Sequence, residues 1–254
     1  MSAAGKRLFY GWYIAAAGAG TNCVVLGITQ FGFGVFIEEF RVTFGWSVTA
    51  IALGYSIRTL EQGLFAPFTG FIADRVGPRR MAVTGVTIIS LSLLLFSQAT
   101  TLPLYYAASV VMALGQSIGG PNAFTLAIMR WFVRRRGNAM SVITTGNGFG
   151  YFATLGLAAL IASQGLHDSF LVLGAIVFFV GIPLALVIRD RPEDLGLLPD
   201  GDAPIEDKPG QSGNTIKVQP AGGSGVREAL RTPAFYLLVL AMGAGSAAQL
   251  VWIV

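Results

Sequence analysis

The sequence predicts an all-α membrane protein, and three observations lead to this fold class. Of its 254 residues, 54% are hydrophobic and only 12% are charged, against about 25% charged in an average soluble domain. The hydrophobic residues gather into runs of about 18 or more, the length that a helix needs to cross a hydrocarbon core of ~30 Å. The basic residues lie in the short segments between these runs. A water-soluble fold could not bury this much apolar surface, so we expect the runs to span a membrane.

Seven apolar runs are long enough to form transmembrane helices. The first run is longer than the hydrophobic region of a cleavable signal peptide, which has about 7 to 15 residues, so we expect it to remain in the mature protein. The expected helices cover Gly11–Phe36, Val48–Ile72, Met81–Gln98, Leu104–Met129, Met140–Ala162, Phe170–Ile188 and Ala234–Val254.

The segment between the sixth and seventh runs, Asp190–Thr232, differs in composition. It is rich in Pro, Gly and Asp and has few aromatic residues, so it cannot bury enough apolar area to order itself. We expect a flexible linker with a short amphipathic stretch near 226–230. The expected organisation is a six-helix N-terminal bundle at 1–189, a cytoplasmic linker at 190–232, and the first helix of a truncated C-terminal bundle at 233–254.

Lysine and arginine residues indicate the orientation of the chain. When the runs cross the membrane alternately, nearly all of the 17 basic residues fall on the side that holds the N terminus. Because cytoplasmic loops retain positive charge, we expect a cytoplasmic N terminus in the plasma (inner) membrane. Arg41 falls on the opposite side, and Arg58 falls within the second run. The basic residues of the N-terminal side are Lys6, Arg7, Arg75, Arg79, Arg80, Arg130, Arg134, Arg135, Arg136, Arg189, Arg191, Lys208, Lys217, Arg227 and Arg231.

Charge and residue usage exclude several classes of function. The net charge of +4 and the pI of about 9.5 suit the anionic surface of the lipid bilayer. The basic residues do not gather on one exposed face, so nucleic acid is not an expected partner. One histidine and one cysteine do not supply a metal cluster or a nucleophilic triad. We therefore expect no enzyme activity, no metal and no cofactor.

A glycine-rich and charged loop follows the second run. Gly77 and Pro78 predict a tight turn there, and Asp74 can pair with a neighbouring arginine or cap a helix end. The loop reads Gly70-Phe-Ile-Ala-Asp74-Arg75-Val-Gly77-Pro78-Arg79-Arg80. This sequence resembles the major facilitator superfamily signature G-x-x-x-D-R-x-G-R-[KR], although proline stands where most members carry a basic residue.

Four further stretches resemble the monocarboxylate and oxalate/formate transporter branch of that superfamily. Their order and spacing, from the start of the chain to the linker, carry the resemblance. They are Tyr10-Gly-Trp12, Phe44-Gly-Trp46-Ser47, Trp131-Phe-Val-Arg-Arg-Arg136-Gly, and Arg191-Pro-Glu-Asp-Leu-Gly-Leu-Leu-Pro-Asp200-Gly.

The resemblance implies twelve helices in two pseudo-symmetric halves, with a substrate site near the midplane and rocking between two states. It implies that this chain contributes six helices and one more, and that the missing C-terminal half is a partner. In this branch the basic residues that hold the carboxylate lie mainly in that half. The residues implied to form a conformational latch are Gly70, Asp74, Arg75, Gly77, Arg79 and Arg80.

Two charged residues lie near the middle of the second run. Arg58 and Glu61 are three residues apart and therefore share one helix face. A charge at the bilayer centre costs about 2.5 to 3.5 kcal/mol on insertion scales, so such residues face a cavity or a partner. Arg58 is a candidate anion contact and Glu61 a candidate proton carrier. The alternative is a static ion pair between the two that braces helices.

Polar residues also recur in three other runs. Candidates for the substrate or ion pathway are Asn22, Gln116, Asn147 and Tyr151. Such residues can line a cavity, or they can hydrogen-bond one helix to another. The glycine pairs of Gly115-x-x-x-Gly119 and Gly146-x-x-x-Gly150 predict close helix approach, and their apolar surroundings distinguish them from nucleotide-binding loops.

These features together predict a secondary active transporter for a small organic anion, most simply a carboxylate, working by proton symport or anion exchange. The alternative within the superfamily is an efflux transporter for drugs or metabolites. An alternative of another class is a seven-helix receptor or sensor, although a retinal protein needs a lysine in its last helix and 234–254 contains none.

Overall fold

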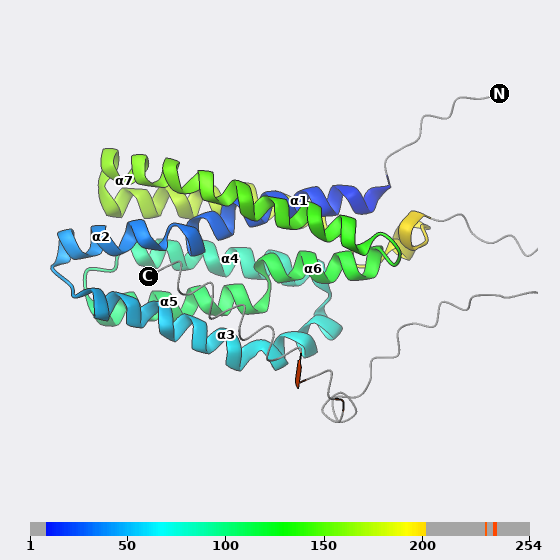
Figure 1. The fold of residues 1–254 in the computed structure, drawn as a ribbon, viewed down its shortest axis with the longest axis horizontal. Coiled ribbons are helices and arrows are strands. Elements are labelled where there is room, and N and C mark those ends of the chain that lie inside the picture. The colour runs from blue at the N-terminus through cyan, green and yellow to red at the C-terminus, as the bar shows by residue number, and fades with distance from the viewer. Residues whose placement is uncertain (1–8, 202–231, 233–235, 238–254) are drawn as a thin grey trace, which may run out of the picture. The chain divides into compact units, whose positions relative to one another are not determined.

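The computed structural model describes residues 9–201, together with Thr232, Tyr236 and Leu237. Residues 1–204 and 205–254 form two separate compact units. Every element between residues 9 and 201 is helical (Figure 1). The elements are α1 (Tyr10–Leu26), the π-helix η1 (Gly27–Phe31), α2 (Phe33–Phe44), α3 (Val48–Val76), α4 (Pro78–Ser97), α5 (Leu102–Ile118), α6 (Gly120–Trp131), α7 (Arg136–Leu186), and the short 3₁₀ helices η2 (Pro192–Leu195) and η3 (Pro199–Gly201).

The described helices make six passes along the bundle, as the sequence predicts, but some passes are divided or joined. The first pass consists of α1, η1 and α2, and it extends eight residues past the predicted end, to Phe44. The fourth pass is broken between α5 and α6, because Gly119 and Gly120 leave helical geometry. The fifth and sixth passes run together as α7, with a kink at Gly165, where φ is 78°.

Three described segments are long and apolar enough to cross a membrane by length and composition: Tyr10–Phe31, Pro78–Ser97 and Arg136–Leu186. The second pass carries charged residues, and the fourth is split into helices of 17 and 12 residues. Of the expected seventh helix, only Tyr236 and Leu237 are described, and both are helical. The rest of that helix lies outside the described residues.

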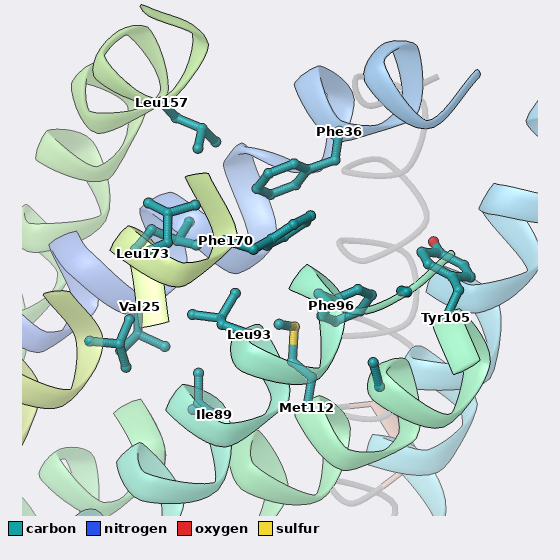
Figure 2. Close-up of a cluster of buried hydrophobic side chains, with 14 of the residues drawn as sticks. Val25, Phe36, Ile89, Leu93, Phe96, Tyr105, Met112, Leu157, Phe170 and Leu173 are labelled. Atoms are coloured by element: carbon teal, nitrogen blue, oxygen red, sulfur yellow. The ribbon is translucent and has the colours of Figure 1, made fainter. Parts of the chain in front are cut away.

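Two apolar clusters form the core. One lies toward the α2–α3 turn and includes Phe36, Phe96, Tyr105 and Phe170, whose rings gather in Figure 2. The other lies at the opposite end, around Trp131, where it joins α1, α4, α6 and α7.

Glycines permit the closest helix crossings. A Cβ on Gly146 of α7 would overlap the Ala19 carbonyl of α1, and one on Gly119 would overlap the Met81 carbonyl of α4. Gly150 of α7 packs against Gly27 of η1, directly after the α1–α7 contact. The close approach that the glycine pairs predict is therefore confirmed.

The structure differs from the sequence prediction for the first part of the expected flexible linker. Residues 190–201 are ordered because their carboxylates bind backbone donors of neighbouring loops. Asp190 accepts a hydrogen bond from the Arg79 N–H at 2.9 Å. Asp200 accepts three, from the N–H groups of Val133, Arg134 and Arg135, at 3.0, 2.8 and 3.2 Å. The composition of this segment predicted that it buries too little apolar area to become ordered. The hydrogen bonds to Asp190 and Asp200 order it without such burial. Residues 202–231 lie outside the described part.

Asp200 gives the protein a testable pH dependence. Partial burial raises the pKa of this carboxyl, but the backbone donors of residues 133–135 outweigh burial and hold the pKa below its ordinary value. A depressed pKa means that the stabilisation is present above the unfolded-state pKa and is lost as pH falls through the folded-state value. We expect Asp200→Asn to lower the thermal unfolding midpoint by about 2–4 °C at pH 7, the equivalent of ~1 kcal/mol.

The difference in unfolding midpoint between wild type and Asp200→Asn should shrink toward pH 3. Scanning fluorimetry of both purified proteins from pH 7 to pH 3 measures this difference. Asp194→Asn is the matched control, because Asp194 lies in the same segment and is exposed. A midpoint difference for Asp200→Asn that stays constant over this pH range would contradict the assignment.

Candidate substrate site

A cavity of about 560 Å³ lies between the helices of the first, second, fourth and fifth passes. It occupies the half of the bundle that carries the α3–α4 and α6–α7 loops. Ten of its fourteen lining residues carry amide or hydroxyl side chains, and these come from six elements. The polar lining residues are Asn22, Gln30, Gln62, Thr69, Gln116, Ser117, Asn122, Thr125, Thr144 and Asn147.

The π-helix η1 places Gln30 at this wall and Thr29 just behind it, in the wall of a second, smaller pocket. Such one-turn bulges insert an extra residue into a helix and are frequent at functional sites. Thr29 accepts a hydrogen bond from Gln116 Nε2 at 2.7 Å, and Gln116 in turn accepts one from Gln62 Nε2. Gln30 faces the cavity beside them. A chain of hydrogen bonds therefore fixes α3, α5 and η1 around the cavity.

Arg58 lies next to this network and is buried, with 5% of its surface exposed. Its Nη2 contacts Gln30 Oε1 at 3.4 Å, its Nη1 contacts Met112 Sδ at 3.3 Å, and its guanidinium lies 4.7 Å from the Tyr55 ring centroid. None of the described residues forms an ion pair with it. A buried cation without a counterion is costly, and the cost falls when an anion binds.

The far side of Arg58 is apolar and almost filled. The guanidinium borders a pocket of only about 30 Å³, whose wall includes Phe36, Phe40, Tyr105 and Phe170. The rings of Phe36 and Phe170 stack with centroids 4.7 Å apart (Figure 2). The bundle is therefore closed by aromatic side chains on one side of Arg58, while the polar cavity lies on the other.

Glu61 does not form the ion pair that its spacing from Arg58 allows. Both of its carboxylate oxygens are buried and lack a hydrogen-bond partner among the described residues. The guanidinium of Arg58 is directed instead to Gln30 and Met112. The static brace between the two charges is therefore absent from this structure.

The predicted pathway residues separate into two groups. Asn22, Gln116 and Asn147 all line the cavity, and Asn22 Nδ2 donates to Asn147 Oδ1 at 2.9 Å. Tyr151 does not line it. Its ring is 62% exposed and stacks on Phe31 with centroids 3.8 Å apart, because the π-helix turns Phe31 toward α7.

The predicted latch residues lie at the α3–α4 turn, at the end of the bundle nearest Tyr10. Gly77 adopts φ of 83°, and a Cβ there would meet the Asp190 carboxylate. The guanidinium of Arg75 lies over the Phe71 ring at 4.2 Å. Arg80 is exposed and Gly70 has open space beside it, while the Asp74 side chain lies outside the described part. The segment that follows α7 therefore holds this turn through the hydrogen bond from Arg79 N–H to Asp190.

Sequence reasoning missed Gln30 and Gln62. Gln62 follows Arg58 by four residues and so shares its helix face, a signal that the sequence contains. Gln30 directly follows Thr29 in the π-helix, and the two line different pockets: Thr29 the aromatic one and Gln30 the polar cavity. The π-helix departs from regular helical spacing, so helical periodicity did not place Gln30 beside Arg58.

Six helical passes surround a polar cavity, and Gln30 in its wall contacts Arg58, which is buried and has no ion-pair partner among the described residues. This is the architecture of an integral membrane protein with a candidate solute site. The Major Facilitator Superfamily family model matches residues 19–254. The chain therefore belongs to this superfamily, whose members are transporters of small molecules rather than enzymes or seven-helix receptors.

The chain is also similar to individual proteins, among them monocarboxylate transporters and a multidrug resistance protein. Monocarboxylate transporter 13 of Rattus norvegicus is 30% identical over 179 residues, which cover 70% of this chain and 40% of the relative. Monocarboxylate transporter 14 of Mus musculus is 28% identical over 201 residues, covering 77% and 38%. Multidrug resistance protein 2 of Bacillus subtilis (strain 168) is 23% identical over 148 residues, covering 58% and 35%. The chain spans about 40% of the length of the monocarboxylate transporters that it matches.

Proposed function

We propose that the chain forms the N-terminal half of a secondary active transporter for a small organic anion, most simply a carboxylate. Residues 190–232 would link it to a second bundle that begins at 233–254. The observation that carries the proposal is Arg58, a buried guanidinium without a carboxylate partner among the described residues, which contacts Gln30 in the wall of the polar cavity. The similarity of the chain to the monocarboxylate transporters supports the same substrate class.

The substrate carboxylate would supply the counterion that Arg58 lacks. Gln30 would hold the guanidinium toward the cavity, since its Oε1 accepts from Nη2. With the N terminus in the cytoplasm of the plasma (inner) membrane, the cavity would face the cytoplasm and the aromatic cluster would close the outer side. Rocking of this half against the other would then carry the bound anion across.

Uptake of labelled carboxylates into proteoliposomes tests the proposal, with the protein expressed from its complete reading frame. Wild type should accumulate carboxylate under an imposed pH gradient if it is a proton symporter, or against preloaded carboxylate if it is an exchanger. Carboxylate uptake in neither assay would reject the proposal. Export of amphipathic dyes instead would favour the efflux alternative, to which the similarity to Multidrug resistance protein 2 points.

Glu61 would be the proton carrier of a symport cycle. Its carboxylate oxygens are buried and have no hydrogen-bond partner in the part of the chain that the structure describes, so no protein donor there competes with a proton for them. We expect Glu61→Gln to abolish the stimulation of uptake by a pH gradient, by about 10-fold or more, while carboxylate exchange at equal pH continues. Glu38→Gln is the control, because Glu38 is exposed and pairs with Arg41. Undiminished stimulation in Glu61→Gln would exclude this role.

A further inference from the structure

The two contacts that join the guanidinium of Arg58 to η1 and α5 are weak. Its Nη2 lies 3.4 Å from Gln30 Oε1, longer than the usual distance of about 2.7–3.2 Å for such a hydrogen bond. Its Nη1 lies 3.3 Å from Met112 Sδ, and a thioether sulfur is a weak acceptor. A guanidinium receives a carboxylate through two parallel hydrogen bonds only in a defined orientation. That orientation must therefore depend on how firmly η1 and α5 are held against α3.

Gln116 joins the same three elements through shorter hydrogen bonds. This residue lies in the last turn of α5 and is 6% exposed. Its Nε2 donates to Thr29 Oγ1 of η1 at 2.7 Å, and its Oε1 accepts from Gln62 Nε2 of α3. One buried amide therefore connects η1, α5 and α3, the three elements that meet at Arg58.

The contacts of Arg58 and Gln116 belong to one register between α3 and α5. Arg58 and Gln62 are four residues apart and share one face of α3, and Met112 and Gln116 share one face of α5 in the same way. Arg58 contacts Met112, and Gln62 contacts Gln116, with 54 positions between the partners in both pairs. A shift of Gln116 relative to Gln62 would therefore also move Met112 relative to Arg58.

Thr29 fixes the direction of this hydrogen-bond chain. Its hydroxyl proton is committed, because Oγ1 donates to the Val25 carbonyl at 2.8 Å. The hydroxyl can therefore only accept from the amide, so Gln116 must direct its NH₂ group to Thr29 and its carbonyl oxygen to Gln62. Hydrogen bonds in such a chain polarise and strengthen one another. Loss of one member would loosen η1 from α5, and Gln30 would lose its fixed position.

We propose that Gln116 is a positioning residue that holds η1 and α3 in place around Arg58, so that the guanidinium keeps the orientation that binds a carboxylate. This inference rests on the proposed function, because Gln116 acts through Arg58 and need not contact the substrate itself. Its consequence is a dependence between the two residues. The contribution of Gln116 to transport should disappear when residue 58 has no planar guanidinium to orient.

A double-mutant cycle in proteoliposomes tests this dependence. The protein is expressed from its complete reading frame, and the probe is whichever of labelled acetate, lactate and oxalate the wild type takes up fastest. Gln116→Leu should lower kcat/KM by about 10-fold, since a displacement of about 1 Å can cost about 100-fold. In an Arg58→Lys background the same change should cost less than about 2-fold, because an ammonium has no planar pair of donors. Equal losses in both backgrounds, or no loss in either, would overturn the inference.

Two threonines provide a second test if Gln116→Leu folds poorly. Thr29 and Thr87 each donate to the carbonyl four residues earlier at 2.8 Å, but of these two only Thr29 also accepts from Gln116. Thr29→Val should lower kcat/KM by about 5- to 10-fold, whereas Thr29→Ser and the matched control Thr87→Val should stay within about 2-fold of wild type. Equal losses in the two valine variants, or wild-type uptake in folded Thr29→Val, would overturn the inference. Wild-type uptake in both Arg58→Gln and Arg58→Lys would instead reject the role of Arg58 in the proposed function.

Discussion

Arg58→Gln is expected to lower carboxylate uptake by about 100-fold without lowering the thermal stability of the protein. A substrate carboxylate that loses a buried, hydrogen-bonded charge partner loses about 2–5 kcal/mol of binding free energy. The empty protein responds differently, because its Arg58 has no carboxylate partner among residues 9–201 to lose. Removing an uncompensated buried charge relieves a desolvation cost, so the unfolding midpoint should stay constant or rise.

Initial uptake rates and unfolding midpoints, measured on the same purified variants, separate this role from a structural one. If Arg58 had a structural role, Arg58→Gln would lower the unfolding midpoint as well as the uptake rate. Arg58→Lys should keep part of the uptake, since the charge remains while the planar two-donor geometry is lost. Arg41→Gln is the control for charge alone, because Arg41 is exposed and pairs with Glu38. Uptake in Arg58→Gln at the wild-type rate would exclude Arg58 from the pathway.

Hydropathy and glycine spacing predicted the bundle well. Six passes follow from the lengths of the apolar runs, because a membrane imposes helix length directly. The close crossing of α1 and α7 follows from Gly146 and Gly150, because small residues permit backbone contact. The ordered segment 190–201 was not predictable from composition, since Asp190 and Asp200 order it by accepting hydrogen bonds from loops more than 60 residues away in sequence.

The candidate site was predicted less completely, for two physical reasons. Side-chain partners depend on tertiary approach, and the Asn22–Asn147 hydrogen bond joins residues 125 positions apart. Helical periodicity also assumes a regular helix, whereas the π-helix at Gly27–Phe31 shifts the phase. This shift brings Gln30 to Arg58 and turns Phe31 onto Tyr151. The spacing of Arg58 and Glu61 permitted an ion pair that the surrounding side chains do not favour.

Gly146→Ala and Gly148→Ala are expected to change stability in opposite directions, although they lie two residues apart on α7. A Cβ at Gly146 would overlap backbone atoms of Ala19 in α1, whereas one at Gly148 meets no atom within 4 Å. Backbone cannot rotate away as a side chain can, so α1 and α7 must separate, at a cost of about 1–3 kcal/mol or more. At Gly148 alanine only gains helix propensity, about 1 kcal/mol.

Thermal unfolding in one detergent measures both variants. Gly146→Ala should unfold about 5–10 °C below wild type and Gly148→Ala at or slightly above it. Transport should follow the same order, because separating α1 from α7 also parts Asn22 from Asn147, which sit beside the crossing and line the cavity. Gly146→Ala with an unchanged midpoint would mean that the two helices do not meet backbone to backbone. In that case the positions of Asn22 and Asn147 in the cavity wall, which depend on the contact between α1 and α7, would also be wrong.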